Sequence, residues 1–346
     1  MEVDLKERIN PSEVNHSNMT EVAQTIGMGQ QAKLPVKLSW TDLTFEVYNP
    51  KLKTTKTVLN KCTGFAAPGL TTYIMGASGA GKTSLLNALS DRVKIGKHSK
   101  ITGEILINQT VKMESRLFGK IASYIMQDDY IFEYFTVRES LLFSARLKLC
   151  KNSEEEIERI VDDTLATLNI SKIANTIVGS SEKCNIAKSQ RKMVAIAIEL
   201  VTNPSLIFLD EPTSGLDSTM ALQVSKLLRR LAYDYNKTIV ATIHQPSSEA
   251  FELFDRLILI CDGNTVYQGM AKRVTQHFTS MGFQFKSFSN PADNFMRVMH
   301  VNYPKEEKDL KLIELLVSTY ENTLKEKVES DSGRIEIPTD FDITEL

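Results

Sequence analysis

Apolar and polar residues alternate with two different periods along this chain. Helical spacing appears in SLLNALSDRV (84–93) and in MVAIAIEL (193–200). Short apolar runs of the strand type occur at LTTYIM (70–75), LIFLD (206–210), TIVATIH (238–244) and LILI (257–260). Strands separated by helices favour a mainly parallel α/β core. The pattern therefore predicts the α/β fold class.

The middle of the chain is predicted to be a helical insertion. Residues 136–139 (TVRE) and 153–156 (SEEE) both have the spacing of a capping box, which marks the start of a helix. After the second, Ile157, Val161 and Leu165 fall on one helical face, as expected for core packing. Before this insertion, residues 36–48 (VKLSWTDLTFEVY) and 103–108 (GEILIN) have strand character.

Composition narrows the function classes. The chain has 346 residues, 42% hydrophobic and 24% charged, as in an ordinary globular protein. The net charge of -2 gives no electrostatic basis for binding nucleic acid, so we expect no nucleic-acid partner. The four cysteines form no C-x-x-C pair, which favours reduced thiols. No apolar run reaches the roughly 18–20 residues that a membrane span needs, and the charged N-terminus lacks a signal-peptide pattern.

A phosphate-binding loop is predicted at residues 76–83. GASGAGKT fits the pattern G-x-x-x-x-G-K-[ST] and lies between a strand and a helix. Its glycines let main-chain N–H groups turn towards phosphate oxygens, and the helix N-terminus adds a favourable dipole. Lys82 is expected to reach the β- and γ-phosphates, and Thr83 to ligate Mg²⁺. The predicted nucleotide contacts here are Gly76, Ala77, Ser78, Gly79, Ala80, Gly81, Lys82, Thr83 and Ser84.

A second candidate site follows the apolar strand in LIFLDEPTSGLD (206–217), which ends in adjacent carboxylates. Asp210 is expected to hold Mg²⁺, directly or through water, and Glu211 to act as general base on the attacking water. Gln127, in YIMQDD, is a candidate for contact with Mg²⁺ and water. His244, in TIHQPS, is a candidate for contact with the γ-phosphate. Spacing alone leaves a structural role equally open for the last two.

These motifs occur in the order found in ATP-binding cassette (ABC) ATPases, and the chain resembles the G subfamily, the white-type half-transporters. The narrower resemblance rests on TVRESLLFSARL (136–147), TIHQPSSEAFELFDRL (242–257), GNTVYQG (263–269) and NPAD (290–293). It implies a P-loop ABC-type ATPase core with a small antiparallel β subdomain and a helical subdomain. The expected divisions are a disordered tail (1–35), a nucleotide-binding domain (36–300, helical subdomain about 128–200) and a linker or tail (301–346).

The resemblance also implies ligands and partners. ABC domains work as head-to-tail pairs that hold two ATP molecules, each between the P-loop of one domain and the signature loop of the other. ATP and Mg²⁺ are therefore the expected ligands, and Asp217 is expected to communicate across the dimer. An aromatic residue upstream of the P-loop often stacks on adenine in this family. Tyr48 is the candidate here, and Phe45 is the alternative.

The signature loop departs from the family pattern. It is usually LSGGQ-like, but IAKSQ (186–190) stands in its place, so that Ala187 replaces the serine and Lys188 and Ser189 replace two glycines, whereas Gln190 matches. One hydrogen bond to a charged group is worth about 1.5–3 kcal/mol, or roughly 10–150-fold in affinity. A homodimer would weaken both ATP sites, so we expect a heterodimer. The alternative is that the divergent loop works normally.

The leading interpretation is the ATPase module of an exporter, paired with the transmembrane domain of a half-transporter. The chain shows no membrane span, so we expect a soluble module, with no transmembrane segment, at the cytoplasmic face of a membrane. The alternative is a hydrolysis-poor, nucleotide-gated binding or regulatory subunit without its own membrane domain. A third class, ATPases that act on ribosomes or DNA, is disfavoured because the chain is neither tandem nor coiled-coil-bearing.

Overall fold

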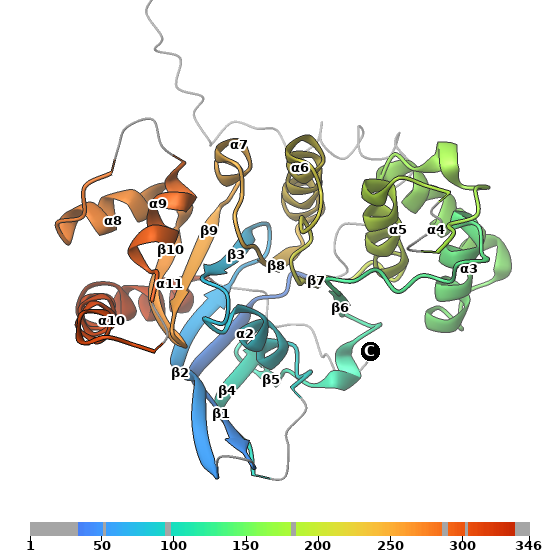
Figure 1. Ribbon diagram of the computed structural model, residues 1–346. Coiled ribbons are helices and arrows are strands. Elements are labelled where there is room, and N and C mark those ends of the chain that lie inside the picture. The colour runs from blue at the N-terminus through green and yellow to red at the C-terminus, as the bar shows by residue number, and fades with distance from the viewer. Residues whose placement is uncertain are drawn as a thin grey trace, which may run out of the picture.

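The computed structural model describes residues 34–50, 53–93, 98–180, 185–285, 290–301 and 304–335. Nearly all of the predicted disordered tail lies outside the described residues. The described part consists of two β-sheets with helices packed around them and a separate helical lobe at one end (Figure 1).

The larger sheet carries most of the candidate site. Its strand order is β10-β9-β3-β8-β7-β6, and all neighbours are parallel except the β9–β10 hairpin. The strands are β3 (Thr71–Gly76), β6 (Ala122–Ile125), β7 (Leu206–Leu209), β8 (Thr238–Thr242), β9 (Arg256–Cys261) and β10 (Asn264–Met270). The four apolar runs predicted as strands are thus confirmed as β3, β7, β8 and β9. Both faces of this sheet are covered, which is why these strands are apolar on both sides.

The smaller sheet is antiparallel, with the order β2-β1-β4-β5, and it confirms the expected β subdomain. Its strands are β1 (Leu38–Asn49), β2 (Thr54–Ala66), β4 (Lys100–Ile107) and β5 (Val111–Lys112). Helix α2 (Lys82–Leu89) packs between the two sheets through Leu85 and Leu86. Along β3, Ile74 faces this core, whereas Tyr73 and Met75 face the opposite core, as strand alternation requires.

The helical lobe lies between β6 and β7 in the chain. It contains α3 (Val137–Lys148), α4 (Glu154–Thr167), the short turn η2 (Ser171–Ile173) and α5 (Lys188–Leu200). Both predicted capping boxes form: Thr136 and Glu139 satisfy each other's main-chain N–H groups at α3, and Ser153 and Glu156 do so at α4. Figure 1 shows this lobe standing apart from the two sheets.

The remaining helices flank the larger sheet. They are α6 (Ser218–Tyr235), α7 (Ser248–Phe251), α8 (Val274–Ser280), α9 (Pro291–Val298), α10 (Glu307–Tyr320) and α11 (Glu326–Arg334), with the short turns η1 (Ser115–Leu117), η3 (Ala271–Arg273) and η4 (Glu321–Lys325). Helices α10 and α11 lie within the segment that was predicted to be a C-terminal linker or tail. Leu316, Tyr320 and Val328 are buried against the sheets, and this burial stabilises helices in an otherwise charged segment.

Candidate functional site

The P-loop is shaped by close contacts of its glycines. It runs from the end of β3 at Gly76 to the start of α2 at Lys82. Gly79 and Gly81 have φ angles of 77° and 110°, a left-handed conformation that favours glycine. A methyl group added to Gly76 would come within 2.3 Å of the Ile260 carbonyl oxygen. The start of the loop thus lies close against β9, and the two left-handed glycines turn the chain into the N-terminus of α2.

Lys82 is almost fully buried within this loop. Its ammonium donates to the carbonyl oxygens of Gly76, at 3.0 Å, and Ala77, at 3.2 Å. Burial lowers the pKa of Lys82, whereas the nearby carboxylates of Glu211 and Asp210 raise it. The side chain thus lies against the loop that it is predicted to serve. Its main-chain partners are exchangeable for phosphate oxygens.

Asp210, directly after β7, joins three elements of the site. Its Oδ1 accepts hydrogen bonds from the hydroxyls of Thr83, at 3.1 Å, and Thr242, at 2.7 Å. Its Oδ2 lies 3.5 Å from the Tyr124 hydroxyl. Burial, followed by the charge of Asp210, raises the pKa of Tyr124, so its hydroxyl remains a donor. The hydroxyl and carboxylate oxygens of Thr83 and Asp210 are ligands of the kind that Mg²⁺ prefers, so this donor set fits the ion.

Glu211 is fixed next to this cluster. Its main-chain N–H donates to the Thr242 hydroxyl at 2.8 Å, and its carboxylate accepts from the Gln127 side-chain amide at 3.1 Å. Its φ angle is 42°, which is uncommon for a residue other than glycine and is often found at functional sites. The structure therefore brings together four residues that the sequence predicted, namely Thr83, Gln127, Asp210 and Glu211.

The other predicted residues lie around this cluster. His244 is half-buried two residues beyond β8, and Asp217 caps α6 by accepting from the Met220 N–H at 3.0 Å. The Tyr48 ring is half-buried and meets the His98 ring edge-on, with centroids 5.1 Å apart. Phe45 is buried in the core between the sheets, so of the two adenine-stacking candidates only Tyr48 leaves ring surface exposed.

The divergent signature loop forms the N-terminus of α5. Ala187 is the N-cap residue and offers no side-chain acceptor, although Gln190 accepts from the Ala187 N–H at 2.9 Å. Ser189 is buried and Lys188 is exposed. A methyl group added to Gly215 would lie 2.5 Å from the Lys188 Nζ. The Lys188 ammonium therefore lies directly against the SGLD turn that follows Glu211.

Two residues of the site were missed from the sequence. Thr242 connects Asp210 to the main chain of Glu211, as described above. Lys192, on the signature helix α5, donates to the Gln127 carbonyl at 2.8 Å and pairs with Asp129 at 2.6 Å. Thr242 carried a usable signal, because it is a polar residue within an apolar strand that is otherwise buried. Lys192 carried none, because it follows the polar residues 188–191 at the start of α5 and its burial is visible only in the structure.

Comparisons with known proteins agree with this geometry. The family profile described as ABC transporter matches residues 59–214. ABC transporter G family member 11 of Arabidopsis thaliana is 39% identical over 276 residues, covering 80% of this chain and 38% of that protein. A probable ATP-dependent permease of Saccharomyces cerevisiae is 40% identical over 260 residues, covering 74% of this chain and 24% of that protein. The chain thus spans well under half the length of these relatives.

The fold is shared with solved structures. One is an ATP-binding cassette described as a dimer in a post-hydrolysis state bound to ADP and Pi. It has a TM-score of 0.56 and 22% identity, and the match covers 68% of this chain and 98% of that chain. Fold and site together define an ABC-type ATPase. The chain contains the nucleotide-binding domain of an ABC transporter, and it resembles the G subfamily.

One expectation is wrong. The chain was expected to be a soluble module, with no transmembrane segment, at the cytoplasmic face of a membrane, but the profile described as ABC-2 type transporter matches residues 244–322. These residues include β9, β10 and helices α7 to α10. Among the described residues, no helix has both the length and the apolar character needed to cross a membrane. The criterion of an apolar run of roughly 18–20 residues therefore does not detect the similarity of residues 244–322 to this profile.

Proposed function

We propose that this chain is the ATP-binding and ATP-hydrolysing module of a G-subfamily-like ABC exporter. The observation that carries the proposal is the convergence of Lys82, Thr83, Asp210, Glu211 and Gln127 at one edge of the larger sheet. A buried cation, an oxygen donor pair and a separate carboxylate are the groups that phosphoryl transfer to water requires. Closure of an ATP-bound pair of such modules would move an attached membrane domain, and hydrolysis would reset it.

Each side chain has a proposed role in this reaction. The P-loop N–H groups and Lys82 bind the phosphates of ATP. Thr83 and Asp210, assisted by Gln127, hold Mg²⁺, which neutralises charge on the phosphates. Glu211 accepts a proton from the attacking water, in an orientation set by its hydrogen bond from Gln127. His244 contacts the γ-phosphate, and Tyr48 stacks on adenine.

The partner surface includes the signature loop and Asp217. We infer that these face a second nucleotide-binding domain, and that the pair is a heterodimer with two unequal sites. The loss of a hydroxyl at Ala187 and of two glycines at Lys188 and Ser189 weakens the site to which IAKSQ contributes. Lys188 offsets part of this loss, because it adds a positive charge at the N-terminus of α5, where an anion would bind.

A second partner surface is the aromatic patch formed by Met126, Tyr130, Phe132, Tyr134 and Phe143. These side chains are 41–89% exposed, and Phe132 lies against Phe143 with centroids 5.3 Å apart. The patch lies on both sides of Gln127 in the chain and continues onto α3. Exposed aromatic clusters of this kind are typical of protein interfaces. We propose that the transmembrane domain of the half-transporter packs here, so that its movement reaches Gln127.

ATP turnover and dimer formation by the purified chain test the proposal. Glu211→Gln is expected to abolish turnover and retain ATP. The Lys188→Gly, Ser189→Gly variant is expected to hydrolyse ATP faster than the natural chain, and this gain should disappear when Glu211→Gln is added. On gel filtration with ATP, the triple variant should dimerise, whereas Glu211→Gln alone stays monomeric.

Three outcomes would contradict parts of this proposal. Undiminished turnover in Glu211→Gln would remove the catalytic assignment. Equal rates for the natural chain and the glycine variant would remove the asymmetry, because IAKSQ would then work normally. If the natural chain and the glycine variant both bind ATP without turnover, the hydrolysis-poor regulatory subunit is favoured. The divergent loop makes this subunit the second candidate.

A further inference from the structure

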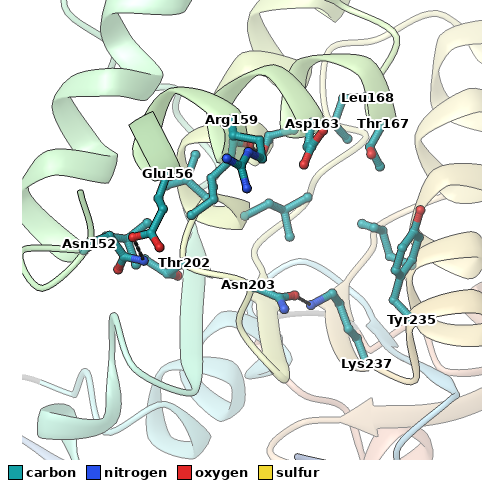
Figure 2. A pocket seen from close by; sticks show the side chains of 16 residues that line it. Asn152, Glu156, Arg159, Asp163, Thr167, Leu168, Thr202, Asn203, Tyr235 and Lys237 are labelled. Carbon is teal, nitrogen blue, oxygen red and sulfur yellow. Dashed lines mark hydrogen bonds between the residues drawn. The ribbon is translucent and has the colours of Figure 1, made fainter. Parts of the chain in front are cut away.

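A cavity of about 490 Å³ lies at the seam between the helical lobe and the sheet core. One wall is formed by α4, and the others by the end of α5 and the residues after it, by α6 and by Lys237 just before β8 (Figure 2). Its surface is largely apolar, with Ile160, Leu168, Leu231 and the Tyr235 ring among the lining residues. No residue assigned above to the nucleotide site contributes to it. The volume is in the usual range for a small-molecule site.

Two of the charged side chains at this cavity already have close partners. Lys237 is buried, and its ammonium donates to the side-chain oxygen of Asn203, at 2.6 Å, and to the Pro204 carbonyl, at 2.7 Å. Glu156 accepts from the Ser153 N–H at 2.9 Å as part of the cap of α4. A ligand would therefore add little to the hydrogen bonding of either charged group.

Asp163 differs from these two. Its side chain is half-buried on α4 at the cavity, in the view of Figure 2 next to Arg159 and opposite Tyr235. Among the described residues, none donates a hydrogen bond to its carboxylate. Burial raises the pKa of Asp163, and the charge of the exposed Arg159 only partly opposes this. Arg159 also lies beside Glu156, so one cation is shared between two carboxylates.

We propose that this cavity binds a small amphipathic cation, an aromatic or other apolar body that carries one protonated amine. The amine pairs with the Asp163 carboxylate, and the apolar body packs against Tyr235, Leu231 and Ile160. An anion is disfavoured, because Lys237 is buried and already bonded, and Arg159 is flanked by two carboxylates. The site is independent of the proposed ATP chemistry.

A ligand in this cavity would bridge two parts of the fold. Asp163 and Ile160 belong to the helical lobe, whereas Leu231 and Tyr235 belong to α6 on the sheet core. The seam is also crossed by a hydrogen bond from Arg230 on α6 to the Thr167 carbonyl at the end of α4. The ligand would therefore add a further connection between the lobe and the sheet and restrict their relative movement.

Calorimetric titration of the whole chain with three probes of one carbon skeleton tests this site. 4-Phenylbutylamine is expected to bind with a Kd of about a millimolar, as fits a ligand of this size. Its neutral counterpart, 4-phenylbutanol, should bind at least tenfold more weakly, since one charge-assisted hydrogen bond corresponds to roughly 10–150-fold. The anionic 4-phenylbutyrate should bind more weakly still.

Two variants and a control locate the binding. Asp163→Asn should reduce the affinity for the amine to that for the alcohol. Tyr235→Leu keeps the charge and should weaken amine and alcohol alike. Asp234→Asn makes the same change at an exposed carboxylate outside the cavity and should leave all three affinities unchanged. Equal affinity for the three probes, full amine binding by Asp163→Asn or by Tyr235→Leu, or equal losses in Asp163→Asn and Asp234→Asn would each overturn the proposal.

Discussion

Thr242 is expected to be one of the most sensitive positions for stability. Its side chain is fully buried, and its hydroxyl makes two hydrogen bonds: it donates to Asp210 at 2.7 Å and accepts from the Glu211 N–H at 2.8 Å. Thr242→Val preserves the shape of the side chain and removes both bonds. The substitution therefore tests the polar connection between the two carboxylate residues with little change in packing.

The expected cost follows from these two bonds. A hydrogen bond to a charged group contributes about 1.5–3 kcal/mol, and a buried group left without a partner costs about 1–3 kcal/mol. Asp210 keeps its bond from Thr83 at 3.1 Å, which reduces the penalty on the carboxylate side. We expect the free energy of unfolding to fall by about 3 kcal/mol, because the two contributions are not additive. With an unfolding entropy of roughly 2.1 cal/mol/K per residue, the Tm should fall by roughly 4 °C.

Thr72 provides the matched control. It is also fully buried, on the neighbouring strand β3, but among the described residues its hydroxyl has no hydrogen-bond partner. Thr72→Val is therefore expected to leave the Tm unchanged or to raise it slightly, because it removes an unsatisfied polar atom. Calorimetry of both variants without nucleotide measures the effect. An unchanged Tm for Thr242→Val, or an equal fall for Thr72→Val, would refute the reasoning.

Two further predictions concern Lys192 and His277. Lys192→Met should lower the free energy of unfolding by about 3–5 kcal/mol in denaturant titrations, because it leaves the Asp129 carboxylate, which is 12% exposed, without its cation. Adding Asp129→Asn should recover most of this loss. If the double variant shows no recovery, this account is contradicted. Burial lowers the pKa of His277 below its usual 6.5. At a pH below 6.5 the unfolded chain therefore binds more protons at this position than the folded chain does. The contribution of His277 to stability should decrease as the pH falls from 6.5 towards the pKa in the folded state. His277→Phe should remove this dependence, so that the Tm difference between variant and natural chain changes between pH 7 and pH 5; a constant difference would argue against it.

The sequence predicted the features that depend on consecutive residues. GASGAGKT contains within eight positions the glycines, the lysine and the hydroxyl that bind phosphate, and the flanking strand and helix follow from local periodicity. The two capping boxes at Thr136 and Ser153 were predictable for the same reason, since the paired side chains are three residues apart. Strand β2 was missed because its first half is exposed and its second half is continuously buried, so it has no single alternation.

Features that join distant residues required the tertiary structure. Thr83, Gln127, Asp210 and Thr242 meet because β3, β8, β7 and β6 are neighbours in the sheet in an order different from their order in the chain. The contact of Lys188 with Gly215 and the cavity beside Asp163 likewise join the helical lobe to the core. The folding of α10 and α11 depends on burial of a few apolar side chains against the sheets. The sequence by itself thus determined the type of chemistry, because its motifs are local, whereas strand order and burial decided which side chains share a site.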